Sequence, residues 1–233
     1  MAKKKVYIGI DPGFSGGITT IDGRKVVVHD IPTYKTISST KKTKQHYDLL
    51  KIVEIFSKYL DRDVECALES VSVMPGEGSV SSFNFGRGIG QLEGMVTFAE
   101  FNLIPVTPQK WKKHFPKLIT PDILALKAEQ KEIRQKSKEL ALKEKDTKET
   151  NKKLKDKDKK SQNKKIIAAL KKEQKDNKNE IAKLGRKVKS HAKDAAREEA
   201  ARLYPNLSDS FKRKKDDGRA ESLLIAEYIK DNT

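Results

Sequence analysis

The chain has 233 residues, and its 50 Lys and Arg against 33 Asp and Glu give a formal net charge of +17. Hydrophobic and charged residues each make up 36% of it, so we expect part of the length to be solvated rather than packed. No apolar run reaches about 18 residues, which excludes a membrane-spanning helix, and the run at 6–10 is too short for a signal peptide. The single cysteine, Cys66, excludes an intramolecular disulfide and indicates a reducing compartment.

Up to about residue 120 the sequence alternates between strand and helix patterns. Three short strands are expected first, and the turn Asp22-Gly23 joins the second to the third. Helices and strands then alternate, which predicts an α/β fold with a mixed sheet and helices on its faces. The predicted strands are 6–10, 16–21, 25–28, 64–68 and 103–106, and the predicted helices are 47–59, 90–101, 192–204 and 218–230.

A basic segment interrupts this pattern. Residues 121–190 contain 24 Lys and Arg and 12 Asp and Glu, a net charge of +12, whereas the other 163 residues carry +5. The segment has one Gly and no aromatic residue, a composition typical of helix. Apolar residues at heptad spacing predict two antiparallel helices in a coiled-coil-like hairpin, with its tip near residues 151–163. These seam positions are Leu126, Ile133, Leu140, Leu154, Ile167, Leu170, Ile181, Leu184 and Val188.

We therefore expect one compact domain formed by residues 1–120 and 190–233, with residues 121–189 inserted as an arm. The clustered Lys of the arm can neutralise a polyanion such as nucleic acid. A solvated helical spacer, whose charge only keeps it soluble, is the alternative. The size of the net charge favours contact with nucleic acid.

Acidic residues follow two of the predicted strands. Asp11 ends the first strand and is followed by glycines, which suits a cation held beside a phosphate. The alternative is an Asp that begins a Pro-Gly turn. Glu69 follows the apolar strand 64–68, where a charge is unusual unless it is paired, binds a metal or faces solvent.

Three more acidic residues stand at the entrance to the last helix. Asp217 and Glu221 share a helix face and can converge on one site, whereas Asp216 points elsewhere and can cap the helix. In a basic protein suited to polyanions, these clusters predict a Mg²⁺-dependent phosphodiesterase site. Two metal ions held by carboxylates would clamp the attacking and leaving oxygens.

The order of these motifs resembles that of the RuvC-type Holliday-junction resolvases, and within them the phage and bacterial RuvC-like branch. The resemblance covers roughly residues 5–116 and 189–229 and leaves the arm as an insertion. It rests on Gly9-Ile10-Asp11-Pro12-Gly13, Ala67-Leu68-Glu69, and Asp217 to Glu221 with the Ser222-Leu223-Leu224-Ile225-Ala226 that follows. Further matches are Met74-Pro75-Gly76-Glu77-Gly78, Ser81-Ser82-Phe83, Phe85-Gly86-Arg87, and Pro108 with Trp111-Lys112-Lys113.

The resemblance implies a ribonuclease H-like fold and a homodimer that resolves four-way DNA junctions by paired nicks. It also implies a place in the cytoplasm of a bacterium or a phage-infected host. Carried over by position, Asp11, Glu69, Asp217 and Glu221 are the catalytic metal ligands, with Asp216 as the alternative to Asp217. They would hold two Mg²⁺ ions, which Mn²⁺ can replace.

This sequence departs from the best-known members at two places. Its fourth carboxylate is Glu rather than Asp, and it stands four positions after Asp217 instead of three. The aromatic wedge of those members is missing, because Ser72 and Val73 occupy its neighbourhood. Phe83 or Phe85 could replace the wedge or belong to the core.

Basic residues near these motifs are candidate DNA contacts. Lys110, Lys112 and Lys113 can grip phosphates while the indole of Trp111 packs, although an ordinary amphipathic helix start gives the same pattern. Arg87, expected in a glycine-flanked loop, is a further candidate. Lys214 and Lys215 would add positive potential beside the acidic cluster.

The sequence leaves other functions open. A non-catalytic DNA-binding or scaffold protein could work through the arm alone. An ATP-binding, kinase-like phosphotransferase also opens with a strand that ends in Asp-x-Gly, but no second phosphate loop is visible here. A nuclease that acts on RNA, R-loops or other branched DNA would carry the same motifs, because phosphate contacts carry no sequence information.

Overall fold

The computed structural model describes residues 4–37, 41, 43–70 and 78–233. The motif at residues 74–77 and the wedge neighbourhood at Ser72 and Val73 lie outside them. The chain forms two compact units, Met1–Leu118 with Lys193–Thr233, and Ile119–Ala192. Within the described ranges, no helix combines the length and hydrophobicity that a membrane span requires.

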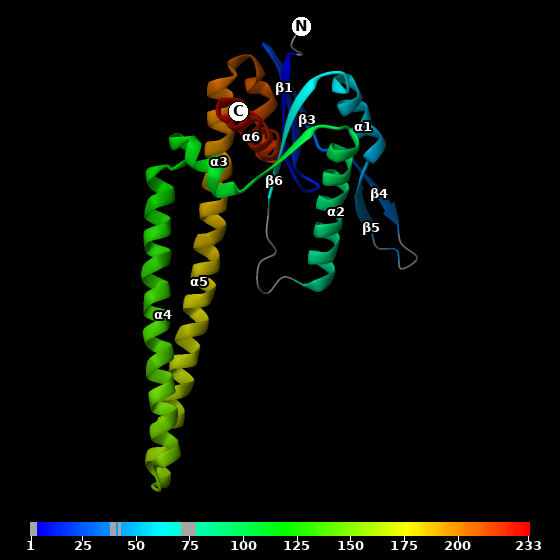
Figure 1. Cartoon of the computed structure of the whole chain (residues 1–233). Coiled ribbons are helices and arrows are strands. Elements are labelled where there is room, and N and C mark those ends of the chain that lie inside the picture. The colour runs from blue at the N-terminus through cyan, green and yellow to red at the C-terminus, as the bar shows by residue number, and fades with distance from the viewer. Residues whose placement is uncertain (1–3, 38–40, 42, 71–77) are drawn as a thin grey trace. The chain divides into compact units, whose positions relative to one another are not determined.

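A five-stranded mixed sheet forms the centre of the first unit, in the order β3-β2-β1-β6-β7 (Figure 1). β1 pairs antiparallel with β2 and parallel with β6, and β6 pairs parallel with β7. This α/β architecture agrees with the prediction and is compatible with a ribonuclease H-like fold. The strands are β1 (Lys5–Asp11), β2 (Gly17–Asp22), β3 (Lys25–Asp30), β6 (Asp63–Glu69) and β7 (Asn102–Val106).

Helices cover both faces of this sheet, because alternate strand residues are buried on opposite sides. On one face Ile8 and Ile10 pack with Cys66 and with residues of α1 (Leu49–Phe56) and α2 (Ser79–Phe98). On the other face Ala67 and Val106 pack with α3 (Pro108–His114), α6 (Asp217–Asn232) and the last residues of α5 (Lys157–Leu203). Short 3₁₀ helices lie at Ser57–Tyr59, Pro116–Leu118, Pro205–Phe211 and Lys214–Asp216.

Glycines bring α6 into backbone contact with the central strands. A side chain at Gly9 of β1 would overlap the carbonyl oxygen of Ser222 and the backbone nitrogen of Ala226. Gly16 forms an isolated β-bridge with Gly218, which would likewise have no room for a Cβ. The glycines after Asp11 therefore let the start of α6 approach the end of β1.

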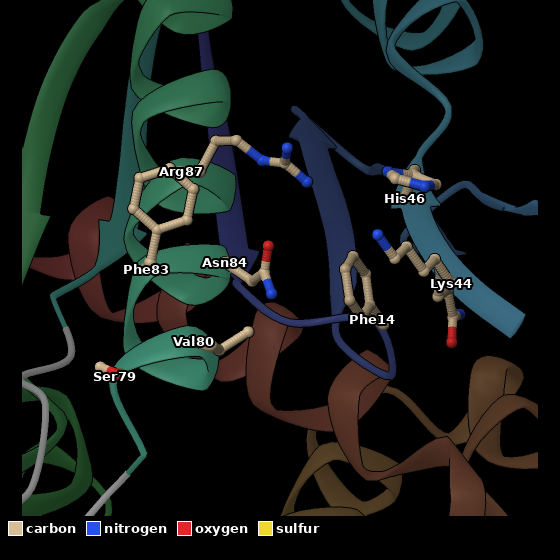
Figure 2. A pocket seen from close by; sticks show the side chains of 9 residues that line it. Phe14, Lys44, His46, Ser79, Val80, Phe83, Asn84 and Arg87 are labelled. Carbon is tan, nitrogen blue, oxygen red and sulfur yellow. The ribbon is translucent and has the colours of Figure 1, made fainter. Parts of the chain in front are cut away.

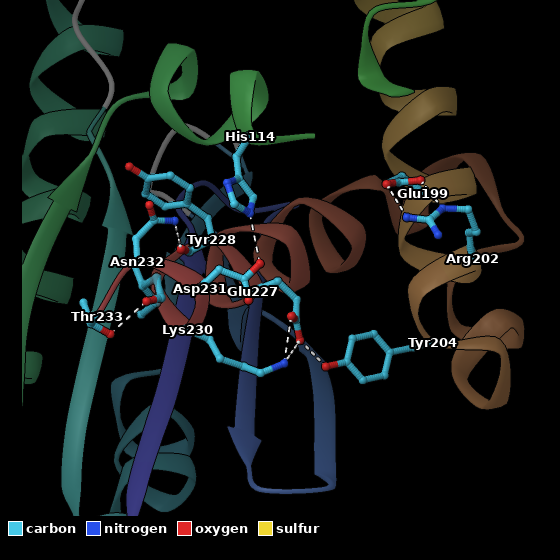
Figure 3. Close-up of polar contacts among 11 residues, drawn as sticks. His114, Glu199, Arg202, Tyr204, Glu227, Tyr228, Lys230, Asp231, Asn232 and Thr233 are labelled. Atoms are coloured by element: carbon cyan, nitrogen blue, oxygen red, sulfur yellow. Dashed lines mark hydrogen bonds and ion pairs between the residues drawn. The ribbon is translucent and has the colours of Figure 1, made fainter. Parts of the chain in front are cut away.

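Polar contacts fix the other end of α6 (Figure 3). The hydroxyl of Tyr204 hydrogen-bonds Glu227, and Lys230 Nζ lies 2.9 Å from Glu227 Oε2. His114 Nε2 lies 3.0 Å from Asp231 Oδ2 and thereby connects α3 to the same helix. Contacts to two neighbouring segments therefore hold the C-terminal part of α6.

The structure differs from the predicted elements at several places, and the helix predicted at 192–204 is the last part of the longer helix α5. A two-stranded hairpin, β4 (Thr33–Ile37) with β5 (Thr43–Tyr47), was not predicted, because most of its side chains are exposed and show no apolar alternation. Tyr47 ends β5 rather than beginning a helix. α2 begins at Ser79 rather than at residue 90. The sequence analysis missed its first half because that part is Gly-rich and lacks strong helix formers.

The second unit consists of α4 (Pro121–Lys153) and the part of α5 up to Ala192. Thr120 caps α4, since its Oγ1 accepts a hydrogen bond from Ile123 N at 3.3 Å. The helices run antiparallel, and Gln130 Nε2 donates to the carbonyl oxygen of Ile181 at 2.9 Å. All of the predicted seam residues are buried or half-buried. Coiled-coil supercoiling stays a prediction.

Candidate functional site

The four predicted carboxylates converge where β1, β6 and α6 meet. Asp11 and Glu69 are the last residues of two adjacent parallel strands, which end at the same edge of the sheet. The start of α6, brought to this edge by Gly218, carries Asp217, and Glu221 follows one turn later. Asp11 is half-buried, and Glu69 and Asp217 are 7% and 8% exposed.

The carboxylates influence one another electrostatically. Burial raises the pKa of Asp11 well above its usual range, and the negative charges of Glu221, Glu69 and Asp217 raise it further. The positive charge of Lys112 acts in the opposite direction. Like charges near one another disfavour joint ionisation.

Glu69 is held by the indole of Trp111. Trp111 is fully buried, and its Nε1 donates to Glu69 Oε1 at 2.8 Å. Burial raises the pKa of Glu69, and the charge of Glu221 adds to this, while the hydrogen bond from Trp111 and the charge of Lys112 oppose it. Trp111 packs as predicted, and in addition it fixes the orientation of a carboxylate.

Two lysines contact the other carboxylates. Lys112 Nζ lies 3.3 Å from Glu221 Oε1 and 4.7 Å from the centroid of the Trp111 ring. Lys193 pairs with Asp217, and this hydrogen bond and the charges of Asp217, Glu221 and Asp11 raise the pKa of Lys193 despite its partial burial. The sequence analysis did not single out Lys193, because one Lys in a Lys-rich stretch gives no signal.

Asp216 has different partners from Asp217. Its side chain is fully buried and accepts hydrogen bonds from the Arg213 backbone nitrogen at 2.9 Å and from the Arg213 guanidinium. Burial opposes ionisation of Asp216, but these hydrogen bonds and the charges of Arg213 and Arg219 outweigh it and lower the pKa. Arg213 therefore holds the Asp216 carboxylate at the entrance to α6.

The chemistry of the four side chains suits a hard divalent cation, since carboxylate oxygens are the ligands that Mg²⁺ prefers. In the described part of the chain, however, no three His, Cys, Asp or Glu side chains are arranged to hold a metal ion. Glu69, Glu221 and Asp217 are engaged by Trp111, Lys112 and Lys193 instead. A cation would compete with the two lysines for the same oxygens.

The other candidate DNA contacts are spread over the surface of the first unit. Lys110 and Lys113 are exposed on α3, and Lys214 and Lys215 are exposed just before α6. The expected loop around Arg87 is wrong, because Arg87 lies within α2. It lines a cavity of about 600 Å³ between α2 and the β4–β5 hairpin (Figure 2).

No protein-family model matches the sequence, and no curated protein matches it. Solved structures match parts of the chain, among them two of RuvC. Thermus thermophilus RuvC in complex with a Holliday junction substrate shows 12% identity and a TM-score of 0.31, over 48% of this chain and 72% of that one. Thermus thermophilus RuvC shows 15% identity and a TM-score of 0.25, over 46% and 67%. Likeness this weak carries no functional argument, so the case rests on the side chains of this chain.

Proposed function

We propose that the protein is a metal-dependent, structure-selective DNA endonuclease that resolves four-way junctions or other branched DNA by paired nicks. The observation that carries the proposal is the cluster of four carboxylates. They come from three distant segments, and burial together with the charges of the other three raises the pKa of Asp11. Such a cluster is costly to build unless positive charge compensates it, and a bound cation would add to the compensation by Lys112 and Lys193.

Asp11, Glu69, Asp217 and Glu221 would hold the Mg²⁺ ions. Bound Mg²⁺ would supply an activated water and stabilise the charge that develops on the scissile phosphate. Trp111 keeps one oxygen of Glu69 in place through its hydrogen bond. Lys112 and Lys193 offset the negative charge of the cluster, which otherwise repels the DNA backbone.

The surface around the cluster supports binding of a polyanion. Lys110, Lys113, Lys214 and Lys215 are exposed on the two elements that flank the carboxylates, α3 and the turn before α6. Together with the net charge of +17 they favour electrostatic capture of DNA. Such contacts position the DNA backbone but do not distinguish one base sequence from another.

A homodimer belongs to the same proposal, because paired nicks need two sites. An apolar patch on α1, on α2 and just after the 3₁₀ helix Ser57–Tyr59 supports contact with a second copy. Val53, Leu60 and Phe98 are 45%, 58% and 87% exposed there. They line one cavity of about 240 Å³ with Gly90 and Gly94, whose missing side chains would let another surface approach.

Cleavage of a labelled four-way junction and a matched linear duplex, with Mg²⁺ or with chelator, tests the proposal. Symmetric Mg²⁺-dependent nicks in the junction alone are expected, with a loss of about a hundredfold or more in Glu69→Gln. Glu54→Gln, the same change at an exposed position of α1, is the matched control and keeps full activity. Tight binding without cleavage under Mg²⁺ or Mn²⁺ would contradict the proposal and favour a binding protein that works through its basic arm.

A further inference from the structure

A groove lies between α2 and the β4–β5 hairpin (Figure 2). Asn84 and Arg87 extend from α2 toward the hairpin, and Lys44 faces them from β5. The ring of Phe14, from the loop after β1, stands between the two elements. The groove measures about 600 Å³, which is within the range of small-ligand sites.

A second cavity adjoins this groove at the residues that follow β1. Phe14 and Asn84 also line this second cavity of about 350 Å³, which reaches Gly13 and Tyr47. The Gly13 backbone nitrogen donates to the Tyr47 hydroxyl at 2.9 Å, and Gly13 stands two positions after Asp11. The ring of Tyr47 meets that of Phe14 edge-on, with centroids 5.2 Å apart. The two cavities therefore form one path beside the end of β1.

The side chains of this path combine aromatic rings with positive charge. Phe14 is 42% exposed and Phe83 is 69% exposed, so their rings are open to a partner. Lys44 and Arg87 add positive charge, and none of the described lining residues is acidic. Exposed rings beside cationic side chains are typical of surfaces that bind single-stranded nucleic acid.

We propose that this groove binds an unpaired nucleotide of the DNA strand that enters the carboxylate site. The inference rests on the proposed function and adds which form of DNA the groove prefers. The base stacks on Phe14, the amide of Asn84 meets the base edge, and Lys44 and Arg87 contact the flanking phosphates. A base within an intact duplex is stacked on its neighbours and cannot enter, so the groove favours DNA with unpaired nucleotides at a branch point.

Fluorescence of 2-aminopurine in the unpaired arm of a forked DNA tests this proposal. The full-length protein is added in the presence of chelator, so that no strand is cut. Stacking on Phe14 should quench the emission saturably, and Phe14→Leu should abolish the quenching and weaken binding of a single-stranded oligonucleotide about tenfold or more. Phe14→Tyr keeps an aromatic ring and should restore both signals, which separates stacking from the packing against Tyr47.

Arg87→Ala provides a second variant at an exposed helix position, where folding is not at risk. It should weaken single-strand binding several-fold. Arg24→Ala removes the same charge from the exposed turn at the opposite end of the sheet and should change nothing. Quenching and affinity that Phe14→Leu leaves unchanged would overturn the inference, even where Arg87→Ala weakens binding. Quenching that depends on Phe14 in a protein that cuts no DNA would support the groove and refute the nuclease.

Discussion

The two units of the molecule carry their charges in different ways. In the first unit Glu69, Asp216 and Asp217 are buried, and each is fixed by a specific partner. In the second unit the Lys side chains are exposed or half-buried, and residues 121–190 hold an excess of 12 positive charges. Activity of the first unit should therefore depend on the geometry of a few side chains. Binding of DNA by the second unit should depend on the total charge of many lysines.

The interiors of the two units also differ in how many side chains they bury. The sheet of the first unit has a buried hydrophobic cluster on each face. The seam of the second unit buries few side chains, and one of them, Glu144, is charged. Hydrogen bonds from Lys148 and Gln174 lower the pKa of Glu144, and Gln174 Nε2 lies 2.9 Å from its Oε2. We expect the first unit to keep its structure when the second is removed.

The largest effect is expected from a pair of neighbouring carboxylates in the first unit. Asp217→Asn should reduce junction cleavage about a hundredfold or more, because it removes a proposed metal ligand. Asp216→Asn should keep cleavage within a few-fold and instead lower the free energy of unfolding by about 1–2 kcal/mol, because it breaks the contacts with Arg213. Single-turnover cleavage and urea unfolding of both variants measure this contrast. The reverse pattern would assign the ligand role to Asp216.

The second prediction concerns the arm. Replacing residues 122–187 by a short Gly-Ser linker should flatten the slope of log affinity against log salt by several units, because each lost phosphate contact removes about 0.9 from it. Single Lys→Ala changes in the arm should each alter the slope by about one unit or less. Salt-dependent binding titrations measure both. A slope that the deletion leaves unchanged would make the arm a spacer or a site for protein partners.

The smallest expected effect is on stability. The folded-state pKa of Asp11 is raised, so the folded protein binds this proton more tightly than the unfolded chain does. The stabilisation from this proton is complete below the ordinary aspartate pKa and is lost as the pH rises through the folded-state value. Asp11→Asn should therefore raise the Tm of the metal-free protein by a few degrees at neutral pH and by less in acid.

Thermal unfolding at several pH values measures this difference. Asp61→Asn, the same change at an exposed position, is the control and should leave the Tm unchanged. An Asp11→Asn protein that is less stable than the wild type at neutral pH would show that the carboxylate cluster is not under electrostatic strain.

Much of the first unit could be predicted from its sequence, because the signals are local. Apolar runs predicted the strands, and Asp22-Gly23 predicted the turn between two of them. The i, i+4 spacing of Asp217 and Glu221 predicted that these two carboxylates lie on one face of α6. The order of the motifs carried the resemblance to the RuvC-type resolvases. Whether these carboxylates bind metal stays a prediction.

Other features depend on tertiary contacts that leave no local signal. The β4–β5 hairpin is exposed on most positions and therefore lacks an apolar pattern. Lys193 is one of many lysines in its stretch, and its pairing with Asp217 follows only from the packing of α5 near α6. The groove around Phe14 likewise needs three elements that are distant in the sequence.

Calorimetric titration of the protein with Mn²⁺ tests the central claim most directly, because it measures the metal site without DNA or cleavage. We predict saturable binding of about two ions per chain. Asp11→Asn should lose at least one of them, whereas Asp61→Asn should bind as the wild type does. Equal binding by Asp11→Asn and the wild type, or no binding by either, would contradict a metal site at the carboxylate cluster.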